Sequence, residues 1–154
     1  MWTDGGAAKI TWVYKWQKLD PELQNDLLGR MTALLMETIP PWWRGLMIDY
    51  GAIGRHIDIG VGVLDPNNDY QPWDPPLEPK QMFQKLRGGM YRDNEGTWWS
   101  ARLRVEPPGR FSVQYNWSVQ PRFTTDVSQE NFALEQERFP RAEAYMPDWY
   151  RARL

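Results

Sequence analysis

The segment TWWSARLRVEPPGRFSVQYNW, residues 97–117, constrains the fold more than any other part of the sequence. Apolar residues alternate with other residues on both sides of a central PPG, and in a strand such residues point to one face. Two matching apolar faces require a connecting loop with an odd number of residues. The three-residue loop 107–109 meets this condition, and Gly109 is free to take a positive φ. The segment therefore predicts a β-hairpin, with faces formed by Thr97, Trp99, Ala101, Leu103 and Val105 and by Phe111, Val113, Tyr115 and Trp117.

A second hairpin is predicted where LMIDY and IGRHIDIGVGVL flank a turn around Gly51 and Ala52. Its second strand has one apolar face, interrupted only by Arg55, and one face rich in glycine. Since glycine has no side chain, another backbone, a helix or a partner can approach that face closely. The apolar face holds Ile53, Ile57, Ile59, Val61 and Val63, and the other face holds Gly54, His56, Asp58, Gly60 and Gly62.

The clearest helix is predicted over DPELQNDLLGRMTALLMETIPP, residues 20–41. Asp20 is a good N-cap, Pro21 is a favoured first residue, and the pair Pro40–Pro41 stops the helix. Between these signals the apolar residues follow a helical period. The stripe consists of Leu23, Leu27, Leu28, Met31, Leu34 and Leu35.

Shorter elements complete the predicted domain. Residues 65–79 form a loop rich in proline, asparagine and aspartate, and a short helix follows it. A third helix begins at Asp126 or Ser128, ends at Pro140 and precedes an aromatic tail, residues 141–154, that folds back. Residues 8–16, AKITWVYKW, alternate as in a strand, although so short a run also fits a helical arm. The apolar side of the second helix is Met82, Phe83, Leu86 and Met90.

These elements predict one α+β domain over residues 1–154. We expect an antiparallel sheet of four or five strands with helices packed mainly on one face, the 20–39 helix and the Phe132/Phe139 helix covering its apolar side. Trp98, Trp99 and Trp117 are expected to divide between the core and the exposed sheet face, since adjacent residues in a strand point to opposite faces. The residues predicted to be structural are Leu27, Met31, Leu35, Trp99, Trp117, Phe132, Phe139 and Trp149.

Composition argues against several classes of protein. The chain has no cysteine, which excludes disulfides, a thiolate zinc site and a cysteine nucleophile. A net charge of −2 without a run of lysine or arginine argues against a nucleic-acid binder. We see neither a signal peptide nor an apolar stretch of ~18 residues, so a cytoplasmic protein without membrane association is expected.

His56 and Asp58 are the candidate catalytic pair, since His56 is the single histidine and both lie on one strand face. Residues two apart in a strand are ~6–7 Å apart at Cα, so direct contact is not assured. We interpret them as the polar face of a sheet and expect no catalytic residue, metal site or cofactor. The acidic pairs Asp65/Asp69 and Glu135/Glu137 could form a glycosidase dyad, but no sequence feature fixes their separation.

The aromatic residues have two interpretations of equal weight. Ten tryptophans in 154 residues can fill a core, or some of them can anchor a protein–protein contact. The adjacent pairs Trp42–Trp43 and Trp98–Trp99 pose the question most directly, because only one of two adjacent residues in a strand can point inward.

Three segments resemble the YezG-type immunity (antitoxin) proteins of bacteria. They are MTALLMETIPPWW, the hairpin GTWWSARLRVEPPGRFSVQYNW with the following PRF, and ERFPRAEAYMPDWYRARL. The resemblance covers residues 20–154, whereas residues 1–19 are not part of the pattern and form an N-terminal arm or extra strand.

The resemblance implies a protein that stays in the producing cell and binds the C-terminal domain of a cognate secreted toxin, a nuclease or an NAD-hydrolysing enzyme. Such an inhibitor needs a complementary surface and no chemistry of its own. Since loops combine exposure with chemical variety, we predict the toxin contact in the 65–74 loop. The alternatives are a small-molecule-binding or hydrolytic enzyme that uses His56 and Asp58, and a carbohydrate-binding module. The predicted contact residues are Asp65, Asp69, Tyr70, Trp73 and Asp74.

Overall fold

The computed structural model describes residues 16–154, so the strand or arm predicted over 8–16 lies outside them except for Trp16. In chain order the elements are α2 (Pro21–Thr38), β1 (Gly45–Ile53), β2 (His56–Leu64), β3 (Tyr70–Pro72), α3 (Leu77–Gly89), β4 (Ser100–Glu106), β5 (Arg110–Asn116), α4 (Gln129–Arg138), the 3₁₀ turn η1 (Glu143–Tyr145) and α5 (Asp148–Arg151).

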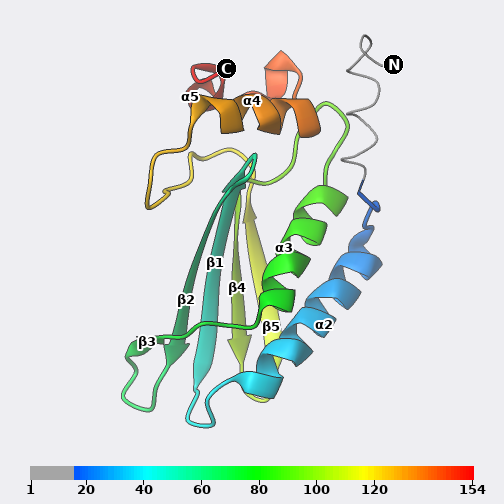
Figure 1. Ribbon diagram of the computed structural model, residues 1–154. Helices are drawn as coiled ribbons and strands as arrows, with labels where there is room; N and C mark the ends of the chain where they lie inside the picture. Colours follow the sequence, from blue (N-terminus) through cyan, green and yellow to red (C-terminus); the bar gives the residue numbers. More distant parts are fainter. Residues whose placement is uncertain (1–15) are drawn as a thin grey trace, which may run out of the picture.

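The strands form one antiparallel sheet in the order β3-β2-β1-β4-β5. Helices α2 and α3 pack side by side against one face, and α4 with the C-terminal turns lies across one end of the sheet (Figure 1). The predicted α+β fold with an antiparallel sheet is confirmed. No helix within residues 16–154 has the length and hydropathy that a membrane span requires.

Helix α2 forms as its sequence signals predict. The Asp20 carboxylate accepts a hydrogen bond from the Leu23 amide at 2.8 Å, and the helix ends at Thr38, before Pro40. Most of its stripe is buried, but Leu23 in the first turn is exposed and lines a surface groove. The buried residues of the stripe are Leu27, Leu28, Met31 and Leu35.

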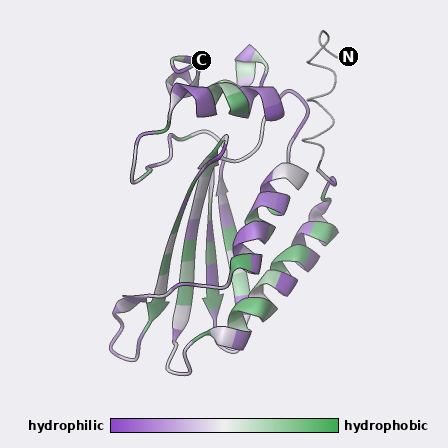
Figure 2. Ribbon diagram, in the orientation of Figure 1, coloured by the Kyte–Doolittle hydropathy of each residue, from purple (hydrophilic) through white to green (hydrophobic). Residues whose placement is uncertain are grey.

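The β4–β5 hairpin has the predicted loop. Glu106 pairs with Arg110, so three residues connect the strands, and Gly109 has a φ of 152°. The register places Val105 opposite Phe111 and Leu103 opposite Val113, so the two apolar faces match. Figure 2 shows hydrophobic positions alternating with polar ones along the strands.

The β1–β2 hairpin turns later than predicted. Gly51 and Ala52 lie inside β1, and the turn is formed by Gly54 and Arg55, with Gly54 at a φ of 61°. Helix α4 stabilises this turn, because the Gly54 amide donates to Glu135 and the Arg55 amide donates to Asn131. These partners are about 80 residues away in the sequence, so local turn signals did not reveal them.

Helix α3 packs beside α2 on the apolar face of the sheet. The prediction that α4 covers this apolar face is wrong. The main core lies between α2, α3 and the sheet and contains Phe83 and Leu86 of α3. Phe132 of α4 belongs instead to a second cluster at the end of the sheet, and Phe139 lies just past the end of α4. That second cluster consists of Ile53, Trp99, Val127, Phe132 and Tyr150.

Trp98 and Trp99 are both fully buried, so the expectation that one of them faces outward is wrong. The regular strand begins only at Ser100, and strict alternation does not extend back to these residues. Trp98 packs in the main core against Tyr50, whereas Trp99 packs in the second cluster against Tyr150. The pair therefore joins the two clusters.

Candidate functional site

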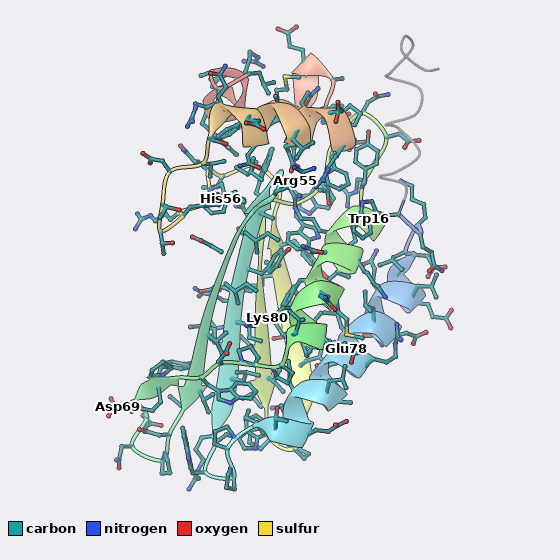
Figure 3. All side chains as sticks on the ribbon, viewed as in Figure 1. Trp16, Arg55, His56, Asp69, Glu78 and Lys80 are labelled. Carbon is teal, nitrogen blue, oxygen red and sulfur yellow. The ribbon has the colours of Figure 1, made fainter. Side chains whose placement is uncertain are left out.

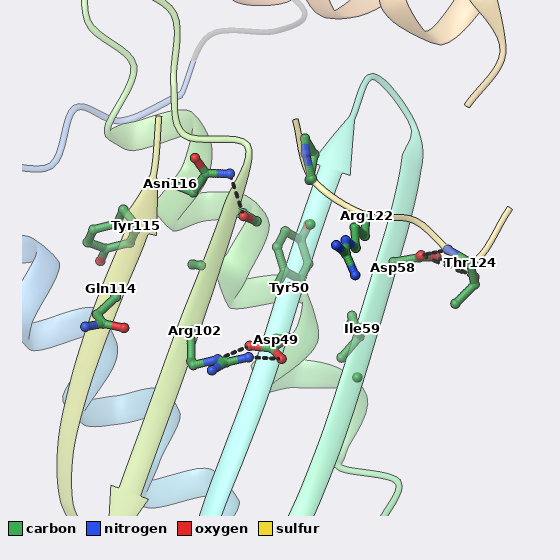
Figure 4. A pocket seen from close by; sticks show the side chains of 15 residues that line it. Asp49, Tyr50, Asp58, Ile59, Arg102, Gln114, Tyr115, Asn116, Arg122 and Thr124 are labelled. Atoms are coloured by element: carbon green, nitrogen blue, oxygen red, sulfur yellow. Dashed lines mark hydrogen bonds and ion pairs between the residues drawn. The ribbon is translucent and has the colours of Figure 1, made fainter. Parts of the chain in front are cut away.

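The sheet face opposite α2 and α3, called the open face below, carries the main candidate site. Its side chains alternate with the core residues of β1, β2, β4 and β5, and most of them are polar and partly or fully exposed. A hollow of about 920 Å³ lies over it, bounded by the strands and by residues 121–124 (Figure 4). The polar residues that line the hollow include Asp49, Asp58, Ser100, Arg102, Gln114, Asn116, Arg122 and Thr124.

An ion pair occupies the middle of the open face. Asp49 and Arg102 are direct partners on β1 and β4, and their side chains meet at 2.6 Å (Nε to Oδ1) and 2.9 Å (Nη2 to Oδ2). This two-point geometry fixes both side chains, and the hydrogen bonds to Asp49 raise the pKa of Arg102. Both groups stay about half exposed, so their contribution to stability is below about 1 kcal/mol.

His56 and Asp58 bind the segment 118–127, which crosses one end of the open face. The Asp58 carboxylate accepts hydrogen bonds from the Thr124 amide at 2.6 Å and from the Thr124 hydroxyl at 3.2 Å. The His56 ring lies 3.4 Å from the Thr125 hydroxyl and meets the Phe123 ring edge-on. The two residues therefore engage different parts of this segment, as tethers.

Gly51 on β1 and Gly62 on β2 permit close packing on this face of the sheet, and of the two only Gly62 belongs to the glycine-rich face that the sequence predicts. A Cβ on Gly51 would lie 3.4 Å from the Phe123 ring, and a Cβ on Gly62 would lie 2.9 Å from Tyr70. Gly60, between them, has no atom of residues 16–154 within 4 Å of such a Cβ. The approaching groups come from this chain itself.

The start of the segment is also fixed. Asn116 donates to Ser100 and to the Val119 carbonyl, and its side-chain oxygen accepts from the Ser118 and Val119 amides. The Trp149 indole donates to the Ser118 carbonyl at 2.8 Å. The segment is thus attached on both sides of Arg122, whose exposed side chain reaches over the strands in Figure 4.

The predicted contact residues of the 65–74 loop separate in the structure. Tyr70 lies on the open face, with its ring over Gly62, and is half exposed. Trp73 is partly buried against the main core, and Asp74 forms an ion pair with Lys80 at 2.8 Å. Figure 3 shows Asp69 and His56 at opposite ends of the sheet. The loop therefore contributes Tyr70 to the open face and Trp73 to the fold.

Asp65 organises the loop that carries these residues. Its carboxylate accepts hydrogen bonds from the amides of Asn67 and Asp69 and from the Gln71 side chain. The bond from Asp69 is the main cause of a lowered Asp65 pKa, and the bond from Gln71 adds to it. Asp65 and Asp69 thus belong to one turn, a structural role that their spacing did not reveal.

The other acidic pair is also separated. Glu135 is buried in an ion pair with Arg87, at 3.0 Å from Nη1 and 2.6 Å from Nη2, whereas Glu137 is exposed. Arg87 also donates from Nε to the Trp98 carbonyl at 2.8 Å. Within residues 16–154 there is no cluster of three or more histidine and carboxylate side chains that could hold a metal ion.

All of the residues predicted to be structural except Phe139 belong to the two clusters or pack against them, and Phe139 is buried outside both. Trp117 and Trp149 are partly buried beside them. Asp49, Arg102, Asn116 and Arg122 were not among the predicted contact residues. Asp49 and Arg102 alternate with core residues along their strands, and this pattern could have predicted that both lie on the face opposite the core. The fully buried or nearly buried members are Leu27, Met31, Leu35, Trp99, Phe132 and Phe139.

No protein-family model matches the chain, and comparison with curated proteins finds no similar sequence.

Proposed function

We propose that this chain is an immunity protein of the YezG type, kept in the cytoplasm of the cell that makes the toxin. It binds the C-terminal domain of the cognate secreted toxin, a nuclease or an NAD-hydrolysing enzyme, and occludes its active site. The observation that carries the proposal is the open face, a polar sheet surface that the described helices leave uncovered and that an anchored segment borders.

A surface of this kind suits an inhibitor because it is already ordered before binding. The Asp49–Arg102 pair, the Asp58–Thr124 bonds and the Asn116 bonds hold its side chains in place. Less conformational entropy is lost when a preorganised surface docks, so more of the contact energy remains as affinity. The hollow is wide and open, which fits a protein contact better than an enclosed small-molecule site.

The enzyme alternative draws less support from the geometry. The carboxylate of Asp58 is engaged by the Thr124 amide and hydroxyl, and the ring of His56 faces Phe123 and Thr125. A catalytic base oriented by a carboxylate would need His56 and Asp58 to act on one another and on a substrate. Each of them instead contacts the 118–127 segment.

The carbohydrate alternative requires a row of exposed aromatic rings. Among the tryptophans of residues 16–154, the most exposed are Trp16 and Trp42, which lie beyond opposite ends of α2. This separation does not form a platform for a sugar chain.

Co-expression tests the proposal directly. A toxin C-terminal domain encoded beside this protein should be lethal alone and tolerated when the protein is produced with it, and the two should be isolated as a complex. The variants His56→Ala and Asp58→Asn should still protect, because the proposed function uses no catalytic group and the side-chain oxygen of the introduced asparagine can still accept the hydrogen bond from the Thr124 amide. Loss of protection in both variants, with fold and binding intact, would favour the enzyme; survival with no complex would also oppose the proposal.

A further inference from the structure

The carboxylates of the open face have partners within the chain, whereas two of its arginines have none among the described residues. Asp49 is paired with Arg102, and Asp58 accepts two hydrogen bonds from Thr124. Glu106, at the far end of β4, is paired with Arg110 at 2.9 Å. Within residues 16–154 the guanidinium groups of Arg104 and Arg122 have neither an ion pair nor a hydrogen bond, and both residues are exposed.

These two arginines flank the hollow from different elements. Arg104 is two residues from Arg102 on β4, so it lies on the same face, ~6–7 Å further along. Arg122 extends from the anchored 118–127 segment over the strands (Figure 4). Neutral Ser112 lies opposite Arg104 on β5, so no carboxylate of that strand neutralises it. The charged side chains of this face therefore carry a formal charge of +1, although the whole chain has a net charge of −2; they are Arg102, Arg104, Arg110, Arg122, Asp49, Asp58 and Glu106.

A guanidinium presents several N–H donors in one plane, an arrangement that matches a carboxylate at two points. We propose, on the basis of the function proposed above, that the open face receives an acidic segment of the toxin, whose Asp or Glu carboxylates bind Arg104 and Arg122. Arg102 donates two hydrogen bonds to Asp49, and these bonds hold its guanidinium between Arg104 and Arg122.

The surrounding charges favour a protein segment over a nucleic acid. Asp49, Asp58 and Glu106 are interspersed among the arginines, so this face lacks the continuous basic track along which a protein follows the successive phosphates of a nucleic-acid strand. A protein segment can instead place single carboxylates at the arginines and basic side chains elsewhere. The acidic 65–74 loop at one end of the sheet would then face a basic part of the toxin, which fixes the direction of docking.

The first experiment uses the whole protein and two simple probes, an oligoglutamate and an oligolysine peptide, followed by NMR at low ionic strength. Oligoglutamate should shift the amide signals of β4 and of residues 120–124, and oligolysine should not shift them. The double variant Arg104→Glu/Arg122→Glu should lose the oligoglutamate response. The control Arg30→Glu, an exposed arginine on α2, should keep it. If oligoglutamate shifts only signals outside β4 and residues 120–124, or if the double variant responds as the unmodified protein does, the inference is overturned.

The second experiment uses the toxin that the co-expression test identifies. Arg104→Glu/Arg122→Glu should bind it at least about tenfold more weakly, with a smaller dependence on salt, whereas Arg30→Glu should bind normally. Unchanged toxin affinity would refute the arginine contact and leave the immunity function standing. If no toxin is neutralised, the proposed function fails, and the peptide titration still decides on the acidic ligand. Concentration-dependent dimerisation lost in the double variant would assign the face to a second copy and overturn the proposal.

Discussion

At the scale of single residues, the buried ion pair of Arg87 and Glu135 links distant parts of the chain. It connects α3 with α4, and through the Gly54 amide it also holds the β1–β2 turn. Both side chains are almost completely buried, so neither charge has water as a substitute partner.

Removing one member of this pair should therefore be costly. We expect Arg87→Met or Glu135→Gln to lower the free energy of unfolding by about 3–5 kcal/mol, because each leaves an uncompensated buried group. The double variant should cost less than the sum of the two single changes. Urea unfolding of the four proteins measures this coupling, and strict additivity would contradict the role given to the pair.

Tyr50 offers a prediction about alkaline pH. Burial raises its pKa from 10.0 to about 12, and its hydroxyl has no hydrogen-bond partner among the described residues. The unfolded chain releases the phenolic proton at lower pH than the folded chain, so this group destabilises the fold as pH rises from 10 towards 12. Below pH 10 the effect is absent.

Tyr50→Phe should thus change stability by less than about 1 kcal/mol at neutral pH, since no intramolecular hydrogen bond is lost. At pH 11 the variant should be more stable than the unmodified protein. Thermal unfolding across this pH range gives the comparison, with Tyr145→Phe, an exposed tyrosine, as control. An equal alkaline loss in Tyr50→Phe and the unmodified protein would contradict the expectation.

At the scale of elements, the β1–β2 turn depends on a close approach to α4. Gly54 has a φ of 61°, and a Cβ there would lie 2.5 Å from the Asn131 carbonyl oxygen. We expect Gly54→Ala to cost more than about 2 kcal/mol, since both the conformation and the contact resist a side chain. Gly60→Ala, in open space on the next strand, should cost less than about 1 kcal/mol. Chemical denaturation distinguishes the two sites, and similar losses would show that the turn does not depend on α4.

The 118–127 segment is bound to β2 through Asp58. Asp58→Ala removes two hydrogen bonds to Thr124, so the amides of residues 122–125 should exchange with solvent about tenfold faster. Asp49→Ala removes a neighbouring carboxylate that does not bind the segment and should leave that exchange unchanged. Mass spectrometry of exchanged peptides provides the measurement. If the segment exchanges at the same rate in both variants, Asp58 is not its tether.

At the scale of the whole molecule, two layers give the protein two different surfaces. The helices shield the apolar face of the sheet, and the opposite face presents the paired and unpaired charges described above. The 65–74 loop extends this second surface at one end through Tyr70, and the 118–127 segment closes it at the other.

The predicted loop contact can be tested at this scale without disturbing the core. Asp69→Lys combined with Tyr70→Ala should weaken toxin binding about tenfold or more and leave the thermal midpoint nearly unchanged, since both residues are exposed. Trp73→Ala is unsuitable for this test, because Trp73 packs against the core and its loss should destabilise the fold. Glu78→Lys, exposed on α3, is the control. If the double variant, the control and the unmodified protein bind the toxin equally well, the toxin does not contact Asp69 and Tyr70.

Local patterns in the sequence were sufficient to predict the ends of α2, the register of the β4–β5 hairpin and the α+β class. The Asp20–Pro21 start and Pro40–Pro41 end define α2, and the odd loop at Pro107–Gly109 fixes the β4–β5 register. The α+β class and the identity of the core residues on α2 followed from these periodicities, because burial of one face repeats along the same element.

Only the tertiary structure decided where residues far apart in the sequence meet. The turn at Gly54 depends on Glu135 and Asn131, both tryptophans at 98 and 99 are buried because two clusters adjoin there, and His56 and Asp58 bind Thr125 and Thr124. A sequence pattern reports which side of an element is apolar. It does not report which distant group will satisfy a given hydrogen bond or charge, and those pairings determine which arginines of the open face have no partner among residues 16–154.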